Sequence, residues 1–116
     1  MTQNLREAKE EDIDAILELY AQPSLDNGVS LSPKEAKEIF RIIKSYPNYK
    51  IYVYEIEQCI VGTIAILIMH NIGHFGKKSA IFESVAIAPE WQGQGIGKKM
   101  LENSIQICQE LGCYKI

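Results

Sequence analysis

The sequence predicts an α/β fold in a single domain spanning residues 1–116, and three observations carry this prediction. Segments with the apolar spacing of amphipathic helices alternate with segments rich in β-branched and aromatic residues. A chain of 116 residues is long enough for one core, and its composition, 47% hydrophobic and 23% charged, is ordinary for a globular protein. The sequence contains no repeat, linker or low-complexity segment that would divide it.

The N-terminal region is predicted to hold a short strand and two helices. Residues 5–8 are the strand candidate, and the acidic residues 10–12 suit the positive end of a helix dipole. Apolar side chains then recur at helical spacing up to Tyr20, and the helix is expected to stop before Pro23. The Asp-Asn-Gly sequence at 26–28 predicts a turn before the second helix.

The second helix is marked by its first residues. Ser32 can cap it, Pro33 fits the first helical position and Glu35 completes a capping box. The apolar stripe expected on this helix consists of Ala36, Ile39, Phe40 and Ile43.

The middle of the chain changes from helical to extended character. Residues 49–56 and 59–70 are rich in β-branched and aromatic residues and are separated by two residues, which predicts a hairpin. A loop with glycines and lysines leads to a third strand over 79–88. We expect this strand to be buried on both faces apart from Glu83 and Ser84.

The last predicted elements follow a glycine-rich turn. Apolar residues from Ile96 to Leu111 recur at helical spacing, and Gly112 is placed to close this helix. Residues 113–116 read as the first residues of another strand.

The glycine-rich turn is the motif with the clearest chemistry. It runs Gln92-Gly93-Gln94-Gly95-Ile96-Gly97 between an apolar strand and a helix start. A helix start presents unpaired backbone N–H groups and partial positive charge, and glycines let a ligand approach the backbone closely. The turn therefore predicts a phosphate site, with Lys98 and Lys99 adding attraction at its rim. The glycine spacing fits neither the dinucleotide-binding motif nor the P-loop.

The same segment resembles the pyrophosphate-binding signature of the GNAT superfamily of N-acetyltransferases, Q/R-x-x-G-x-G/A, on Gln92, Gly95 and Gly97. The predicted order of elements agrees with that family over nearly the whole chain. The resemblance implies a GNAT-like α/β fold with a mixed, mostly antiparallel central sheet flanked by helices. The motif strand and the strand beginning near Tyr114 are then expected to splay apart to admit acetyl-CoA.

The resemblance also implies which residues hold acetyl-CoA, which serves as a co-substrate. Backbone groups of Val85, Ala86 and Ile87 are expected to pair with the pantetheine arm as an added strand. One N–H in that stretch is expected to stabilise the oxyanion that forms on the thioester. The backbone amides expected to hold the pyrophosphate are those of Gln92, Gly93, Gln94, Gly95, Ile96, Gly97 and Lys98.

Glu83 is the candidate catalytic base. Many family members carry an acidic residue near this position, and a base must remove the proton of an ammonium group before the amine can attack. Burial on an apolar strand would raise its pKa toward neutrality. In the alternative interpretation Glu83 faces solvent or pairs with a lysine, since a β-bulge would change its direction. Ser84 is a weaker candidate for a substrate contact.

The resemblance predicts an acetyl-CoA-dependent N-acetyltransferase that acts on a primary amine of a small molecule, peptide or protein, by direct attack in a ternary complex. The alternative within the same fold is a non-catalytic module that binds or senses acyl-CoA. A nucleotide-phosphate binder is a third interpretation, which the glycine spacing disfavours.

The C-terminus is short relative to the family, which usually continues with another helix and two strands. That part generally carries a Tyr that protonates the departing thiolate, so the general acid is not assigned here. A truncated chain, a naturally short chain and a homodimer whose second subunit fills the gap are the open alternatives.

Composition disfavours several other classes of protein. A net charge of -3 without a basic run disfavours nucleic-acid partners, and three cysteines without C-x-x-C spacing predict neither disulfides nor a metal site. The longest apolar stretch, residues 60–69, is about half the roughly twenty residues of a membrane-spanning helix. We therefore expect a cytoplasmic protein without a membrane partner, and we interpret His70 and His74 as surface residues.

Overall fold

Within the described residues of the computed structural model, 2–23, 25–26, 28 and 31–116, five strands form one sheet in the order β1-β2-β3-β4-β5. The strands are β1 (Gln3–Glu7), β2 (Tyr49–Ile56), β3 (Cys59–Met69), β4 (Lys78–Ile87) and β5 (Cys113–Lys115). The helices are α1 (Ile13–Tyr20), α2 (Pro33–Lys44) and α3 (Ile96–Glu110), with 3-10 turns at Glu10–Asp12, His74–Gly76 and Pro89–Trp91. Of the turn predicted at 26–28, Asn27 lies outside the described residues.

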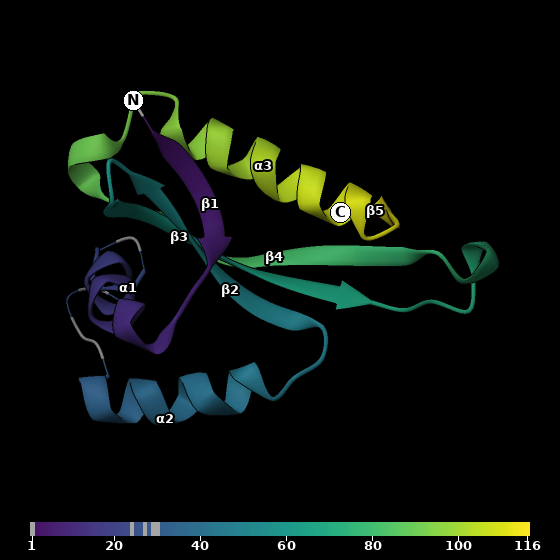
Figure 1. Cartoon of the computed structure of the whole chain (residues 1–116), viewed down its shortest axis with the longest axis horizontal. Helices are drawn as coiled ribbons and strands as arrows, with labels where there is room; N and C mark the ends of the chain where they lie inside the picture. The colour runs from purple at the N-terminus through teal and green to yellow at the C-terminus, as the bar shows by residue number, and fades with distance from the viewer. Residues whose placement is uncertain (1, 24, 27, 29–30) are drawn as a thin grey trace.

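The sheet is mixed and mostly antiparallel, as predicted. Strands β1 to β4 pair antiparallel with their neighbours, and β5 runs parallel to β4. Helices α1 and α2 cover one face of the sheet and α3 covers the other (Figure 1). Figure 1 also shows β3 and β4 continuing together as a long hairpin that extends away from α1 and α2.

The strands alternate their side chains between two hydrophobic clusters. Beneath α3, the buried members are Tyr54, Ile56, Val61, Ile64, Ile66, Ala80, Ile96, Met100 and Cys108. Beneath α1 and α2, they are Ala8, Ile13, Ile16, Ala36, Phe40, Ile51, Val53 and Ala65. None of the helices in the described part of the chain combines the length and apolar character needed to cross a bilayer.

Helix α2 begins where its cap predicts. The Ser32 hydroxyl accepts a hydrogen bond from the backbone N–H of Glu35 at 3.2 Å. It also donates to the Glu35 carboxylate at 3.0 Å, so the side chains pair directly. On the predicted stripe, Ala36 and Phe40 are buried, whereas Ile39 remains 44% exposed.

Strand β4 is less buried than the sequence predicts. Ile81 and Val85 are each 40% exposed, and Glu83 and Ser84 are also exposed. The physical reason lies at the edge of the sheet, because β5 pairs with β4 only at Lys78 and Ser79. The exposure predicted for Glu83 and Ser84 is confirmed, whereas the burial predicted for Ile81 and Val85 is wrong.

A β-bulge interrupts β4 at its centre. Glu83 lies opposite Ala65 of β3, and Ala86 lies opposite Thr63, so two residues of β4 stand where β3 has one. Ser84 within the bulge has a φ of 51°, in the left-handed region that non-glycine residues seldom adopt. The extra residue reverses the alternation, so Glu83 and Ala86 both face α1 and α2.

Gly62 of β3 sets how closely α3 approaches the sheet. A Cβ atom at this position would lie 2.8 Å from Ile87 Cδ1, 3.0 Å from Met100 Sδ and 3.3 Å from the Ala86 carbonyl oxygen. A side chain at this position would displace the ends of the Ile87 and Met100 side chains and press on the Ala86 carbonyl oxygen.

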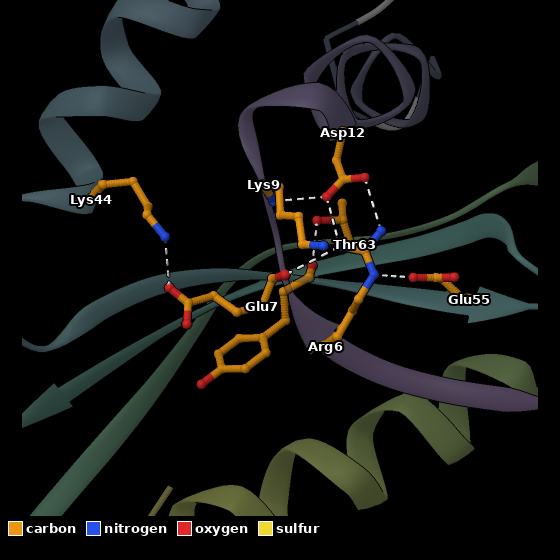
Figure 2. A network of polar contacts seen from close by, with 8 residues as sticks. Arg6, Glu7, Lys9, Asp12, Lys44, Glu55 and Thr63 are labelled. Carbon is orange, nitrogen blue, oxygen red and sulfur yellow. Dashed lines mark hydrogen bonds and ion pairs between the residues drawn. The ribbon is translucent and has the colours of Figure 1, made fainter.

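A polar network joins β1 to the start of α1 (Figure 2). The Asp12 carboxylate accepts two hydrogen bonds from the Arg6 guanidinium, at 2.7 and 2.9 Å, and one from the Lys9 backbone N–H at 2.7 Å. Arg6 also pairs with Glu55 of β2. Asp12 is 5% exposed, and the hydrogen bonds from Arg6 are the main cause that lowers its pKa.

We expect Gly62→Ala to lower the free energy of unfolding by about 1–3 kcal/mol, because the methyl group overpacks the contact with Ile87 and Met100. Urea unfolding measures this change. Gly97→Ala is the matched control, since its nearest neighbour beyond the helix would be Ile87 Cγ1 at 3.6 Å, an ordinary contact. Equal stability of the two variants would contradict the packing argument.

We expect Asp12→Asn to cost about 1.5–3 kcal/mol at pH 7, because the ionised partner of Arg6 is lost. A carboxyl whose pKa is lowered by folding contributes stability that is complete above its unfolded pKa and is lost as the pH falls through the folded pKa. Unfolding measured from pH 7 to pH 2 should therefore show a smaller decline in the variant than in the native chain. Glu10→Gln, which breaks an exposed and solvent-screened pair with Arg41, should change the native pH profile much less than Asp12→Asn.

Candidate active site

The glycine-rich turn adopts the conformation that its glycines allow. Gly93 and Gly95 have φ values of 78° and 80°, in the left-handed region. Gly95 is the N-cap of α3 and offers no side chain to the helix start. Residues 92–95 and Lys98 are exposed, so the turn faces solvent.

The start of α3 presents unpaired backbone donors. The Lys99 N–H bonds to the Gly95 carbonyl oxygen at 3.2 Å and closes the first helical turn. The N–H groups of Ile96, Gly97 and Lys98 precede it and have no acceptor within the helix. These three groups and the helix dipole form a surface suited to phosphate oxygens. The Gln92 N–H differs from them because it donates to the Pro89 carbonyl oxygen at 3.2 Å.

Two glutamine side chains tie the turn to the end of β4. The Gln92 and Gln22 side-chain amides donate to the Ile87 carbonyl oxygen at 3.0 and 2.9 Å. Gln92 also donates to the Gln22 side-chain oxygen at 3.1 Å. The first residue of the signature therefore positions the turn through its side chain. The sequence pattern contains no signal for Gln22, which lies in the connection after α1.

The outer edge of β4 is open beside this turn. The Ala88 N–H donates to the Val61 carbonyl oxygen at 2.8 Å, toward β3. Backbone groups of successive strand residues point to opposite edges, so those of Val85 and Ile87 point away from β3 and those of Ala86 toward it. Strand β5 pairs with β4 only at Lys78 and Ser79, so among the described residues none pairs with the outer edge of β4 along this stretch.

Glu83 lies on the sheet face that α1 and α2 cover. It is directly opposite Ala65 of β3, which is opposite Ile51 of β2, so the three side chains form a row across the sheet. Glu83 is exposed, as the alternative interpretation of the sequence has it, because the side chain stands beside the unpaired edge. Burial raises the pKa of nearby Tyr49, and the negative charge of Glu83 adds to this rise.

Tyr20 is a residue of this region that sequence reasoning did not single out. Burial raises the pKa of its hydroxyl, and the nearby hydroxyls of Thr63 and Ser84 partly offset the rise. The last residue of α1 thereby reaches the bulge of β4. In the sequence Tyr20 is one member of an apolar helix stripe, and only the folded arrangement brings it to Ser84.

The two histidines lie away from this site. His70 and His74 are exposed, and His74 packs against the Tyr114 ring at a centroid distance of 4.4 Å. Within residues 2–23, 25–26, 28 and 31–116, no cluster of three or more metal-binding side chains is found.

Comparisons of the sequence with known proteins find acetyltransferases. The sequence model of the acetyltransferase (GNAT) family matches residues 6–116. The glucosamine 6-phosphate N-acetyltransferase of Trypanosoma brucei brucei is 26% identical over 113 residues, which cover 97% of this chain and 76% of that protein.

Solved structures share the fold. The glucosamine-6-phosphate N-acetyltransferase of Arabidopsis thaliana has a TM-score of 0.81 and 26% identity, over 99% of this chain and 80% of that one. A transcriptional regulator from Bacillus halodurans C-125 has a TM-score of 0.88 and 25% identity, over 99% of this chain and 79% of that one. These likenesses confirm the mixed α/β fold expected from the sequence.

Proposed function

The chain belongs to the GNAT family of acetyltransferases, and from this premise we propose that it transfers an acetyl group from acetyl-CoA to a primary amine by direct attack in a ternary complex. One observation carries the proposal. A Cβ atom on Gly97, at the start of α3, would lie 3.6 Å from Ile87 Cγ1, at the end of β4. The unpaired donors of the helix and the unpaired edge of the strand therefore adjoin, and they suit a pyrophosphate that continues into an extended arm.

The residues of this chain fit acetyl-CoA, which supplies the acetyl group as a thioester. The N–H groups of Ile96, Gly97 and Lys98 would hold the pyrophosphate, and the positive φ of Gly93 and Gly95 shapes the turn around it. The exposed Lys98 side chain adds positive charge at the rim. No capping side chain of the turn competes for these donors.

Strand β4 would hold the pantetheine arm along its outer edge. Val85 and Ile87 direct backbone groups to that edge, and Ala86 fixes the strand by pairing with Thr63. Because glutamine amides already occupy the Ile87 carbonyl oxygen, its N–H and the groups of Val85 are the partners that remain. A backbone N–H from the stretch beside the bulge would stabilise the oxyanion on the thioester.

Glu83 is our candidate for the base that frees the amine. An alkyl ammonium with a pKa of about 10.4 is deprotonated to only about one part in a few thousand at pH 7, roughly 4.6 kcal/mol. An exposed carboxylate on the face of α1 and α2 has room to accept this proton through a water molecule. Its row with Ala65 and Ile51 directs it toward the helices, away from α3.

Two classes of amine are candidates for the acceptor. The relatives from Trypanosoma brucei brucei and Arabidopsis thaliana carry names that specify glucosamine 6-phosphate, which makes this amino sugar the first acceptor to assay. A small aliphatic or aromatic amine is the second. A cytoplasmic setting and a homodimer stay predictions from the sequence.

We expect the chain to release free CoA thiol when acetyl-CoA is mixed with an accepted amine, and Glu83→Gln to lower kcat about a hundredfold because the proton acceptor is lost. Thiol release across a panel of amino sugars, polyamines, arylalkylamines and peptides measures both effects from pH 6 to pH 9. Glu102→Gln, on the exposed side of α3, is the control and should match the native chain.

Two results would contradict this account. Binding of acetyl-CoA without thiol release from any amine would favour the non-catalytic sensing module of the same fold. Native turnover by Glu83→Gln at every pH would remove Glu83 as the base and leave the transfer itself in place.

We expect Gly95→Ala to weaken CoA binding about tenfold, because a left-handed conformation costs alanine about 1–2 kcal/mol and the turn would relax away from its shape. Titration calorimetry with CoA measures the dissociation constant. Gly112→Ala is the matched control, since Gly112 has a φ of 89° at the opposite end of the same helix. It should lose similar stability but bind CoA normally, and equal CoA affinity in the two variants would refute the site.

A further inference from the structure

A pocket of about 130 Å³ lies between α1 and α2, on the sheet face to which Glu83 belongs. Its walls are apolar and include Ile13 and Ile16 of α1, Phe40 of α2 and Ile51 of β2. Figure 1 shows the two helices side by side on this face of the sheet. Exposed apolar side chains continue the pocket at its mouth, where Ile39 is 44% exposed.

Asp26 supplies the one charged side chain among the described lining residues of this pocket. Asp26 and Tyr20 are the polar side chains among its described lining residues, and none of these residues is cationic. Both residues line the pocket, and the Asp26 charge makes a small addition to the raised pKa of Tyr20, which burial mainly causes. This environment favours a ligand with an apolar body and a positive charge.

Tyr20 joins the pocket to the bulge of β4. Tyr20 lines the pocket, and its hydroxyl lies near the hydroxyls of Thr63 and Ser84. Glu83, next to Ser84, stands in the cross-strand row that ends at Ile51 of the pocket wall. Glu83 on β4 and Ile51 on β2 are two strand spacings apart, about 10 Å. A short amine bound in the pocket can bridge this distance.

We propose that this pocket binds the acceptor, and that the acceptor is a primary amine with a compact apolar body, a phenylalkyl or branched alkyl group, without a phosphate. The inference rests on the proposed acetyl transfer and names its substrate class. An apolar cavity of about 150 Å³ accommodates benzene, so this pocket has the size for one ring or a branched chain. A sugar phosphate would place its anion beside Asp26 and its hydroxyls against apolar walls.

The test compares phenethylamine, 2-phenylethanol and glucosamine 6-phosphate. We expect kcat/KM for phenethylamine to exceed that for glucosamine 6-phosphate at least about tenfold. Phenethylamine should raise the melting temperature of the chain without acetyl-CoA, and the uncharged alcohol should raise it less. Asp26→Asn should raise KM for phenethylamine about two- to fivefold, as expected for an exposed charge.

Two lysine variants on α2 locate the ligand. Ile39→Lys places a cation at the mouth of the pocket and should lower kcat/KM for phenethylamine at least about tenfold. Ile42→Lys is the matched control, because Ile42 is 54% exposed on the same helix outside the pocket. Both positions are exposed, so both variants are expected to fold.

The outcomes separate this inference from the transfer reaction. If glucosamine 6-phosphate is the better acceptor, or if the two lysine variants behave alike, the pocket assignment is wrong and acetyl transfer stands. If no amine releases thiol while phenethylamine stabilises the native chain and Ile42→Lys but not Ile39→Lys, the pocket assignment stands and acetyl transfer is wrong.

Discussion

At Gly62 the backbone of β3 lies so close to α3 that a Cβ atom would come within 2.8 Å of Ile87 Cδ1 and 3.0 Å of Met100 Sδ. This close approach holds the start of α3 against the last residue of β4. The unpaired donors of the helix and the unpaired edge of the strand become neighbours for that reason. A larger residue at this point would press on the contact between α3 and the end of β4.

The bulge at Ser84 is the second constraint. It sets the direction in which β4 side chains point, whereas Gly62 sets the distance between α3 and the sheet. Residues three apart on a regular strand face opposite sides of the sheet. The extra residue in β4 turns Glu83 and Ala86 to the same side, facing α1 and α2. The carboxylate, the hydroxyls near Tyr20 and the apolar pocket therefore meet on one face, while α3 covers the other.

Short-range sequence patterns predicted most of the helices and strands. The spacing of apolar residues predicted the helices, the two-residue connection at 57–58 predicted the hairpin, and Ser32 marked the start of α2. The exposure of Ile81 and Val85 was not predicted, because it depends on where β5 leaves β4, a contact between segments far apart in the chain. The arrival of Tyr20 at Ser84 and of Gln22 at Ile87 has the same non-local origin.

Cys108 lies on the buried side of α3, at 0% exposure, in the cluster that contains Met100. Burial raises the pKa of its thiol to about 11, with smaller contributions from Cys113. A thiol reagent can therefore modify Cys108 only when α3 lifts from the sheet, whereas Cys59 is exposed in the native state. The rate at which Cys108 is modified, compared with that of Cys59, therefore reports how often α3 opens.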